Sequence, residues 1–298
     1  KLTFSTDATI AQTSANLSQS RQVLAGISDG SIKGYFAGGK NSGGNVVATS
    51  DKLLYSNDIT VAQTSANLSQ VRMALTGCSG EGTKGYFAGG NTTAFGDVVS
   101  TADKLTYAND ITSAQTSANL SGIRRSLTGI SNGSTNGYFA GGDTTVIGTG
   151  LISTTDKITY SNDTTASQTT ANLSQARYSL AGCSGEGTKG YFAGGNTGAT
   201  VKTADKIIYS NDITAAQTSA NLSSVRFGLS GISQGSTQGY FPDGFSSNSV
   251  LTLTSDKTIF ATDTTSFLSS VLLSQNRADY ASAGQEFTSV FGNNSINS

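Results

Sequence analysis

One arginine marks a unit of about 51 residues that recurs along the whole chain. Thirteen residues after each of the first five arginines comes GYFAGG or a close relative, and Asp-Lys follows further on. Self-similarity at a fixed period indicates stacked supersecondary units, because one unit cannot bury its apolar residues alone. The sequence therefore predicts a repeat architecture. The marker arginines are Arg21, Arg72, Arg124, Arg177, Arg226 and Arg277.

Each unit contains four short segments that are typical of β-strands. The first runs from the arginine through Leu-x-Gly-Ile or Leu-x-Gly-Cys, and the second is GYFAGG. The third is Asp-Lys-x-x-Tyr, and the fourth is the Thr- and Ala-rich stretch before Asn-Leu-Ser. Glycine or Asn-Asp turns separate them. Four antiparallel strands in about 50 residues make one propeller blade.

The two ends of the chain look like complementary halves of one more unit. Residues 1–7 align with the third strand and its turn at 52–58, and residues 277–291 align with the first two strands. We therefore expect an all-β, six-bladed β-propeller with four-stranded blades, in which residues 1–18 share a blade with residues 277–292. Closure of this kind removes exposed sheet edges. Seven or another number of blades, an open array and a non-propeller β fold are the alternatives. The whole chain, 1–298, is expected to be one domain, with blades at 19–69, 70–121, 122–174, 175–223, 224–274, and 275–298 together with 1–18.

Composition argues against several classes of function. The net formal charge is −1 and only 12% of residues are charged, whereas nucleic-acid binding needs a basic surface. No apolar run approaches the roughly 20 residues of a membrane span. The chain has no histidine, the commonest general base and a frequent metal ligand. We therefore expect no nucleic-acid partner, no membrane insertion, no cofactor and no enzymatic activity.

Several repeated motifs are better explained by structure than by chemistry. The Arg, Lys and Asp residues at fixed places predict ion pairs between strands or blades, and the Asn-Asp turns predict Asx turns rather than calcium sites. Asn-Leu-Ser matches the N-glycosylation sequon, but its fixed place in the repeat predicts a framework role. Cys78 and Cys183 stand where other units have isoleucine, so they are expected to be buried, reduced and remote from each other.

All variation in repeat length falls in one connection, between the second and third strands. When residues 40–50, 91–102, 143–155, 196–204 and 245–255 are left out, each unit has 40 residues. Variable loops on a constant scaffold often carry function, although neutral drift gives the same pattern. Ile147 and Leu151 add apolar side chains to the third of these loops. The candidate ligand-binding residues are Asn41, Asn45, Phe95, Asp97, Asp143, Asn196, Lys202, Phe245 and Asn248.

The order Arg…Leu…GYFAGG…Tyr resembles the kelch repeat, although this chain lacks the kelch tryptophan. Copper enzymes that share the kelch architecture use histidine ligands, so their activity is not carried over. The run DKITYSNDTTASQTTANLSQAR, followed by GYFAGG, is similar to repeats in structural proteins of tailed phages, notably cyanophages, and in some cyanobacterial proteins. This resemblance covers nearly the whole chain.

The phage resemblance implies a non-enzymatic module of a virion tail or fibre that contacts the host surface. The expected partners are a host cell-surface glycan or protein and other virion proteins, and the expected location is the virion or the cell exterior. A cellular or secreted propeller that binds proteins or sugars is the alternative, and a propeller enzyme is a more distant one.

Overall fold

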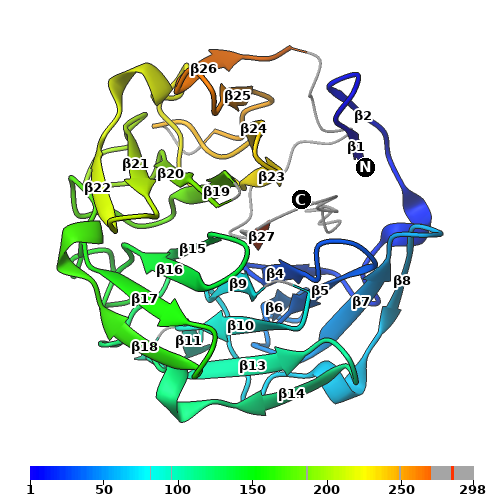
Figure 1. The fold of residues 1–298 in the computed structure, drawn as a ribbon. Helices are drawn as coiled ribbons and strands as arrows, with labels where there is room; N and C mark the ends of the chain where they lie inside the picture. Colours follow the sequence, from blue (N-terminus) through cyan, green and yellow to red (C-terminus); the bar gives the residue numbers. More distant parts are fainter. Residues whose placement is uncertain (81, 95, 186, 248–249, 270–282, 285–298) are drawn as a thin grey trace.

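The computed structural model shows an all-β propeller, in which small antiparallel sheets surround a common axis (Figure 1). It describes residues 1–80, 82–94, 96–185, 187–247, 250–269 and 283–284. Short 3-10 segments such as η2 (Thr64–Ala66) lie between consecutive blades. No helix in these described ranges has the length and apolar character needed to cross a membrane.

The described residues form five blades of four strands, and in each blade the strands follow sequence order from the axis to the rim (Figure 1). Neighbouring strands are antiparallel, as the glycine and Asn-Asp turns predict. Blade 1 contains β4 (Ala25–Ser28), β5 (Lys33–Ala37), β7 (Ser50–Leu54) and β8 (Ile59–Ala62), and blade 2 contains β9 (Thr76–Gly80), β10 (Lys84–Ala88), β13 (Ala102–Thr106) and β14 (Ile111–Ala114). Blade 3 contains β15 (Thr128–Ser131), β16 (Asn136–Ala140), β17 (Thr155–Thr159) and β18 (Thr164–Ser167), and blade 4 contains β19 (Ala181–Gly185), β20 (Lys189–Ala193), β21 (Ala204–Ile208) and β22 (Ile213–Ala216). Blade 5 contains β23 (Ile232–Gln234), β24 (Gln238–Pro242), β25 (Ser255–Ile259) and β26 (Thr264–Phe267).

The prediction of six blades is wrong. The N-terminus forms only the two-stranded hairpin β1 (Leu2–Thr3) and β2 (Ala8–Thr9), which lies between blade 5 and blade 1 (Figure 1). Of the residues expected to complete this blade, 277–282 and 285–292 lie outside the described part of the chain. The described strand β27 (Ala283–Gly284) pairs in parallel with β4 instead. A parallel strand added to the inner edge of blade 1 does not build an antiparallel blade with the hairpin.

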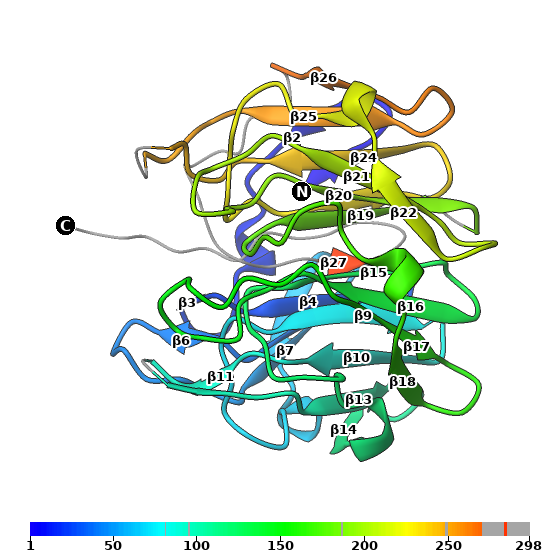
Figure 2. The ribbon, with the colours of Figure 1, turned by 90° about the vertical axis from the view of Figure 1, so that its left-hand side faces the viewer.

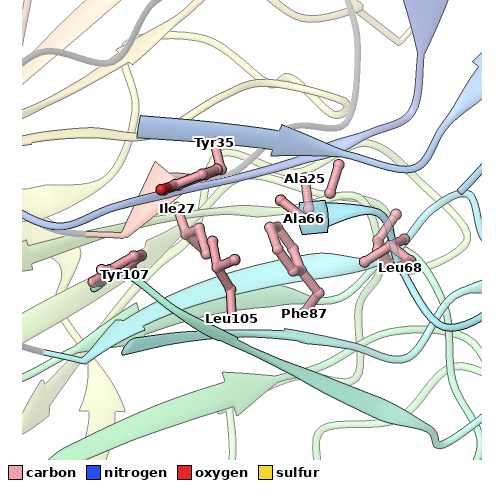
Figure 3. Packing of buried hydrophobic residues seen from close by; sticks show 10 residues of the cluster. Ala25, Ile27, Tyr35, Ala66, Leu68, Phe87, Leu105 and Tyr107 are labelled. Carbon is pink, nitrogen blue, oxygen red and sulfur yellow. The ribbon is translucent and has the colours of Figure 1, made fainter. Parts of the chain in front are cut away.

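The apolar core lies between adjacent blades rather than inside any one of them. Figure 3 shows the cluster between blades 1 and 2, which includes Ile27 and Tyr35 from one blade and Phe87 and Leu105 from the next. Consecutive residues of a strand point to opposite faces of the sheet. In β10, Phe87 therefore packs toward blade 1, and Tyr86 packs toward blade 3. The Tyr-Phe pair of each GYFAGG motif thus buries both faces of its blade.

Glycines allow the blades to approach closely at the axis. A Cβ atom added to Gly129 in β15 would lie 2.2 Å from the carbonyl oxygen of Gly77 in β9, much closer than real contacts allow. Gly38 and Gly39, at the end of β5, have φ angles of 72° and 101°, which favour glycine. The glycine pairs therefore form a tight exit from the second strand of their blades.

Candidate functional site

The marker arginines form buried ion pairs inside their own blades. In blade 2, Arg72 Nη2 donates to Asp103 Oδ2 at 2.6 Å, and both side chains are almost fully buried. The same guanidinium donates to the carbonyl oxygens of Gly89, Thr101 and Phe87. A buried charge is tolerated only when it is paired and hydrogen-bonded, and both conditions are met here. The equivalent pairs are Arg21–Asp51, Arg124–Asp156, Arg177–Asp205 and Arg226–Asp256.

A second set of ion pairs links each blade to the next. Asp110, in the outer turn of blade 2, accepts hydrogen bonds from Lys33, Lys52 and Tyr35 of blade 1. Burial acts to raise the pKa of Asp110, but the hydrogen bonds from Lys33 and Lys52 outweigh it and lower that pKa to about 2. The carboxylates in equivalent positions are Asp58, which pairs with Lys1 of the N-terminal hairpin, and Asp163, Asp212, Asp263 and Asp7. These contacts confirm the predicted pairing between strands and between blades.

The described lysines that have no ion pair, and one exposed aspartate, lie on the variable loops. Among the lysines and arginines of the described residues, only Lys40 and Lys202 have no ion pair. Lys40 begins the first variable loop and Lys202 lies exposed in the fourth. Asp97, in β12 (Gly96–Val98) of the second loop, is also exposed and outside the ion pairs. The unpaired charge of the described surface is therefore concentrated in these loops.

The variable loops share one face of the ring with the connections between blades. The N–H of Leu68, in the connection that follows blade 1, donates to the carbonyl of Ala48 in the first loop at 2.9 Å. Figure 2 shows β6 (Lys40–Asn41) and β11 (Asn91–Thr93), which belong to these loops, on the same side of the disc. We call this the loop face, defined by the described residues of 40–50, 91–102, 143–155, 196–204 and 245–255.

Several predicted ligand residues are engaged in local turns. Asn41 Oδ1 accepts the N–H of Asn45 at 3.0 Å, and Asn196 Oδ1 accepts the N–H of Gly198 at 2.8 Å. Their amide nitrogens are not tied by these bonds, and Asn45 is exposed. These asparagines therefore both shape their loops and face solvent.

Of the two phenylalanines predicted to contact a ligand, the structure describes only Phe245. Phe245 is half-buried and its ring stacks on Phe227, with 5.4 Å between centroids. Phe95 and Asn248 lie outside the described residues. Phe245 thus presents part of one face of a stacked aromatic pair rather than an isolated ring.

Asp143 is not a surface ligand residue, because it is fully buried at the base of the third loop. Its carboxylate accepts hydrogen bonds from the N–H groups of Thr145, Gly148 and Gly150 and from the Thr145 hydroxyl. Buried carboxylates need such partners, and here the loop backbone supplies them. Asp143 therefore organises its loop.

Arg125 also holds the backbone of this loop, a role that was not predicted from the sequence. Its Nε donates to the carbonyl of Thr145 at 2.9 Å and its Nη2 to the carbonyl of Val146 at 2.6 Å. At the tip of the braced loop, Ile147 is 76% exposed. Arg125 follows a marker arginine at a place where the other units have Gln, Met, Tyr, Phe or Ala, and this departure was the available signal.

The repeated motifs that could suggest chemistry are occupied by the framework. Asn57 Oδ1 accepts the N–H of Ile59, as an Asx turn requires, and Asn67 Oδ1 accepts the N–H of Ser50 at 2.8 Å. Cys78 and Cys183 are buried and unpaired, as predicted. Within the described ranges, no group of three or more Asp, Glu or Cys side chains is placed to hold a metal ion.

Part of the chain, the strand β27, lies near the axis of the ring and is surrounded by the inner strands of the blades. Strand β27 lies within 8 Å, between Cα atoms, of the inner strands β4, β9, β15, β19 and β23 (Figure 1). The loop face is therefore the strongest candidate for a functional surface.

A scan against protein-family models and a search of curated proteins both gave no match to this chain.

Proposed function

We propose that this protein is a non-enzymatic binding propeller that serves as an adhesion module of a phage tail or fibre, and that its loop face contacts a host-surface glycan or protein. One observation carries the proposal. The framework neutralises its own charges in repeated ion pairs, whereas Lys40, Asp97 and Lys202 are left unpaired on the variable loops.

The five variable loops present different kinds of side chain, whereas the framework presents the same kinds in every blade. The first and fourth loops offer a cation, the second offers a carboxylate, and the third offers the exposed Ile147. A surface repeated around a ring presents the same groups many times, so it discriminates poorly between partners. Recognition surfaces combine a few apolar anchors with polar groups in defined places, and the loop face has this composition.

The rigidity of the third loop supports a binding role. The side chains of Asp143 and Arg125 hold the loop through six hydrogen bonds, five of them to backbone groups, and they form an ion pair whose closest atoms are 3.6 Å apart. A loop that is already ordered loses less conformational entropy when a partner binds. The tailed-phage resemblance of the repeats supports the assignment to a virion, and the kelch resemblance supports a binding rather than a catalytic propeller.

The test replaces loops and measures binding. Loop 196–204 is grafted in place of loop 91–102, and separately Lys40 and Lys202 are changed to glutamine. Binding is measured on a glycan array and on a protein array of bacterial surface proteins. We expect both variants to unfold at the wild-type temperature and to bind more weakly.

The matched control is Lys104→Gln, which removes a framework lysine of blade 2 that pairs with Asp163. This variant should keep wild-type binding, because Lys104 lies outside the loop face. If grafting all five loops leaves binding unchanged, or if Lys104→Gln weakens it as much as the loop variants do, the proposal is wrong.

A further inference from the structure

Blade 3 contains two Asn-Gly pairs that the structure places in very different surroundings. Asn132-Gly133 lies in the turn between β15 and β16, and Asn136-Gly137 lies at the start of β16. Asn-Gly is the dipeptide in which a side-chain amide is most easily attacked by the following backbone nitrogen, because glycine offers no steric hindrance. The two pairs lie in one chain, four residues apart, so each serves as a control for the other.

The Asn132 side chain sits in a ring of backbone donors. Its Oδ1 accepts the N–H groups of Ser134, Thr135 and Asn136 at 3.1, 2.9 and 2.9 Å. Donors aimed at a carbonyl oxygen stabilise the negative charge that develops there when a nucleophile adds to the carbon. The Gly133 N–H donates to Ser131 Oγ at 2.9 Å, so the proton that must leave this nitrogen already has an acceptor.

Blade 1 shows that the same turn accepts a carboxylate. Asp29 occupies the position of Asn132, and its Oδ1 accepts the N–H groups of Ser31, Ile32 and Lys33 at 3.0, 2.8 and 3.0 Å. The Gly30 N–H also bonds to the serine before the acid, as Gly133 does in blade 3. An aspartate at position 132 would therefore find three hydrogen-bond donors already in place.

Asn136 lacks these features. Gly137 is buried and lies between two ladders, opposite Ser131 on one side and Ile158 on the other. A Cβ at Gly137 would lie 2.1 Å from Cys78 Sγ, so the backbone there has no room to bend. Attack by the Gly137 nitrogen on the Asn136 side chain would require it to leave the sheet.

We propose that Asn132 is a site of spontaneous deamidation in the folded protein and that its product is an α-linked aspartate. The Gly133 nitrogen forms a bond to Asn132 Cγ, the Cγ–Nδ2 bond breaks, and ammonia leaves with the proton from the Gly133 nitrogen. Water then adds to Cγ of the cyclic imide and the Cγ–N bond breaks, which leaves the backbone C–N bond intact and gives a side-chain carboxylate. The net change is amide plus water to carboxylate plus ammonium.

The fold favours this outcome over isoaspartate. Opening at the other carbonyl would insert a carbon into the backbone of a turn that is fixed on both sides. The Asn132 N–H donates to the carbonyl of Asn136 at 3.0 Å, and the Asn132 carbonyl accepts the N–H of Gly187 from blade 4 at 3.1 Å. Only the α-linked product keeps these bonds and the three donors to Oδ1. The modification adds one negative charge to the face opposite the loop face.

Mass spectrometry tests the proposal on the full chain. The protein is incubated folded and, in parallel, unfolded in guanidinium at mildly alkaline pH, and is then digested briefly with trypsin at slightly acidic pH, where further deamidation is slow. Cleavage at Arg125 and Lys157 gives one peptide that contains both Asn-Gly pairs. In the folded sample we expect Asn132 to be converted and Asn136 to stay intact, with α-aspartate as the main product by electron-transfer fragmentation. In the unfolded sample both should react at similar rates.

Conversion of neither residue in the folded protein, equal conversion of both, or a majority of isoaspartate would each overturn the proposal. Two variants test the product without waiting for the reaction. Asn132→Asp should unfold at or above the wild-type temperature, whereas Asn132→Ala should unfold lower, because it leaves three N–H groups without acceptors. If Asn132→Asp is destabilised as much as Asn132→Ala, the turn does not accept the carboxylate and the inference fails.

Discussion

The buried Arg72–Asp103 pair gives the sharpest test of how the framework is held together. Asp103→Asn keeps the shape of the side chain and removes its charge, so the Arg72 guanidinium is left buried without a counter-ion. Three of its hydrogen bonds, to the carbonyls of Gly89, Thr101 and Phe87, remain possible. The variant thus isolates the loss of the ion pair from the loss of packing.

The expected cost follows from burial. Removing one partner of a buried ion pair destabilises a protein by about 3–5 kcal/mol. Arg72→Met should lower the free energy of unfolding by at least as much, because it leaves the Asp103 carboxylate without its counter-ion and three carbonyl groups without their donor. The comparison is Lys104→Met, on the next residue of the same strand, whose pair with Asp163 has side chains 23% and 17% exposed. A pair that water reaches is worth about 0–1 kcal/mol.

Urea unfolding of the three variants provides the assay, followed by circular dichroism. The slope of the transition is measured with the midpoint, so that a change in free energy is separated from a change in exposed surface. If Asp103→Asn costs no more than Lys104→Met, the buried pairs do not stabilise the blades and the reasoning is refuted.

Three further predictions concern packing, pH and the thiols. Gly129→Ala should destabilise the protein by about 1–3 kcal/mol, because its Cβ meets backbone, whereas Gly122→Ala, with nothing within 4 Å, should be neutral in the same unfolding assay. The Asp110 contribution to stability is present above the unfolded pKa, near 4, and is lost as pH falls toward about 2; an acid titration of the unfolding free energy should therefore be shallower in Asp110→Asn than in the wild type. Burial raises the pKa of Cys78 to about 12 and also raises that of Cys183, so a thiol reagent should label neither in the native protein and both after denaturation. Labelling of the native protein, or no free thiol after denaturation, would contradict this last prediction.

Much of the blade could be predicted because its information is local and repeated. GYFAGG recurs as the second strand of the blades because alternating Tyr and Phe must bury two faces, and this requirement is the same in every unit. The ion pairs of the repeated Arg, Lys and Asp residues could be predicted for the same reason. The number of blades was not predictable, since it depends on how the two ends of the chain pair, and Ala283–Gly284 joins β4 in parallel.

The candidate site was harder to predict than the fold. Asp143 looks like a surface ligand in the sequence, because it opens a variable loop beside threonines. Its burial depends on Arg125 and on glycine N–H groups five and seven residues away, a combination that occurs once and that no periodicity reveals. Residues that break a repeat have no second copy to support an interpretation, so their roles had to come from the structure.

The contacts between blades also set an order in which the chain can fold. Lys33 and Tyr35 meet Asp110 at separations of 77 and 75 residues, so a blade can be tied to its successor once the next outer turn exists. Asp7 must wait for Tyr240 and Lys257, which lie 233 and 250 residues away. Contacts between distant parts of a chain form slowly, and during synthesis the second partner does not yet exist. The hairpin is therefore synthesised before the five blades, and its contacts with blade 5 are among the last to form.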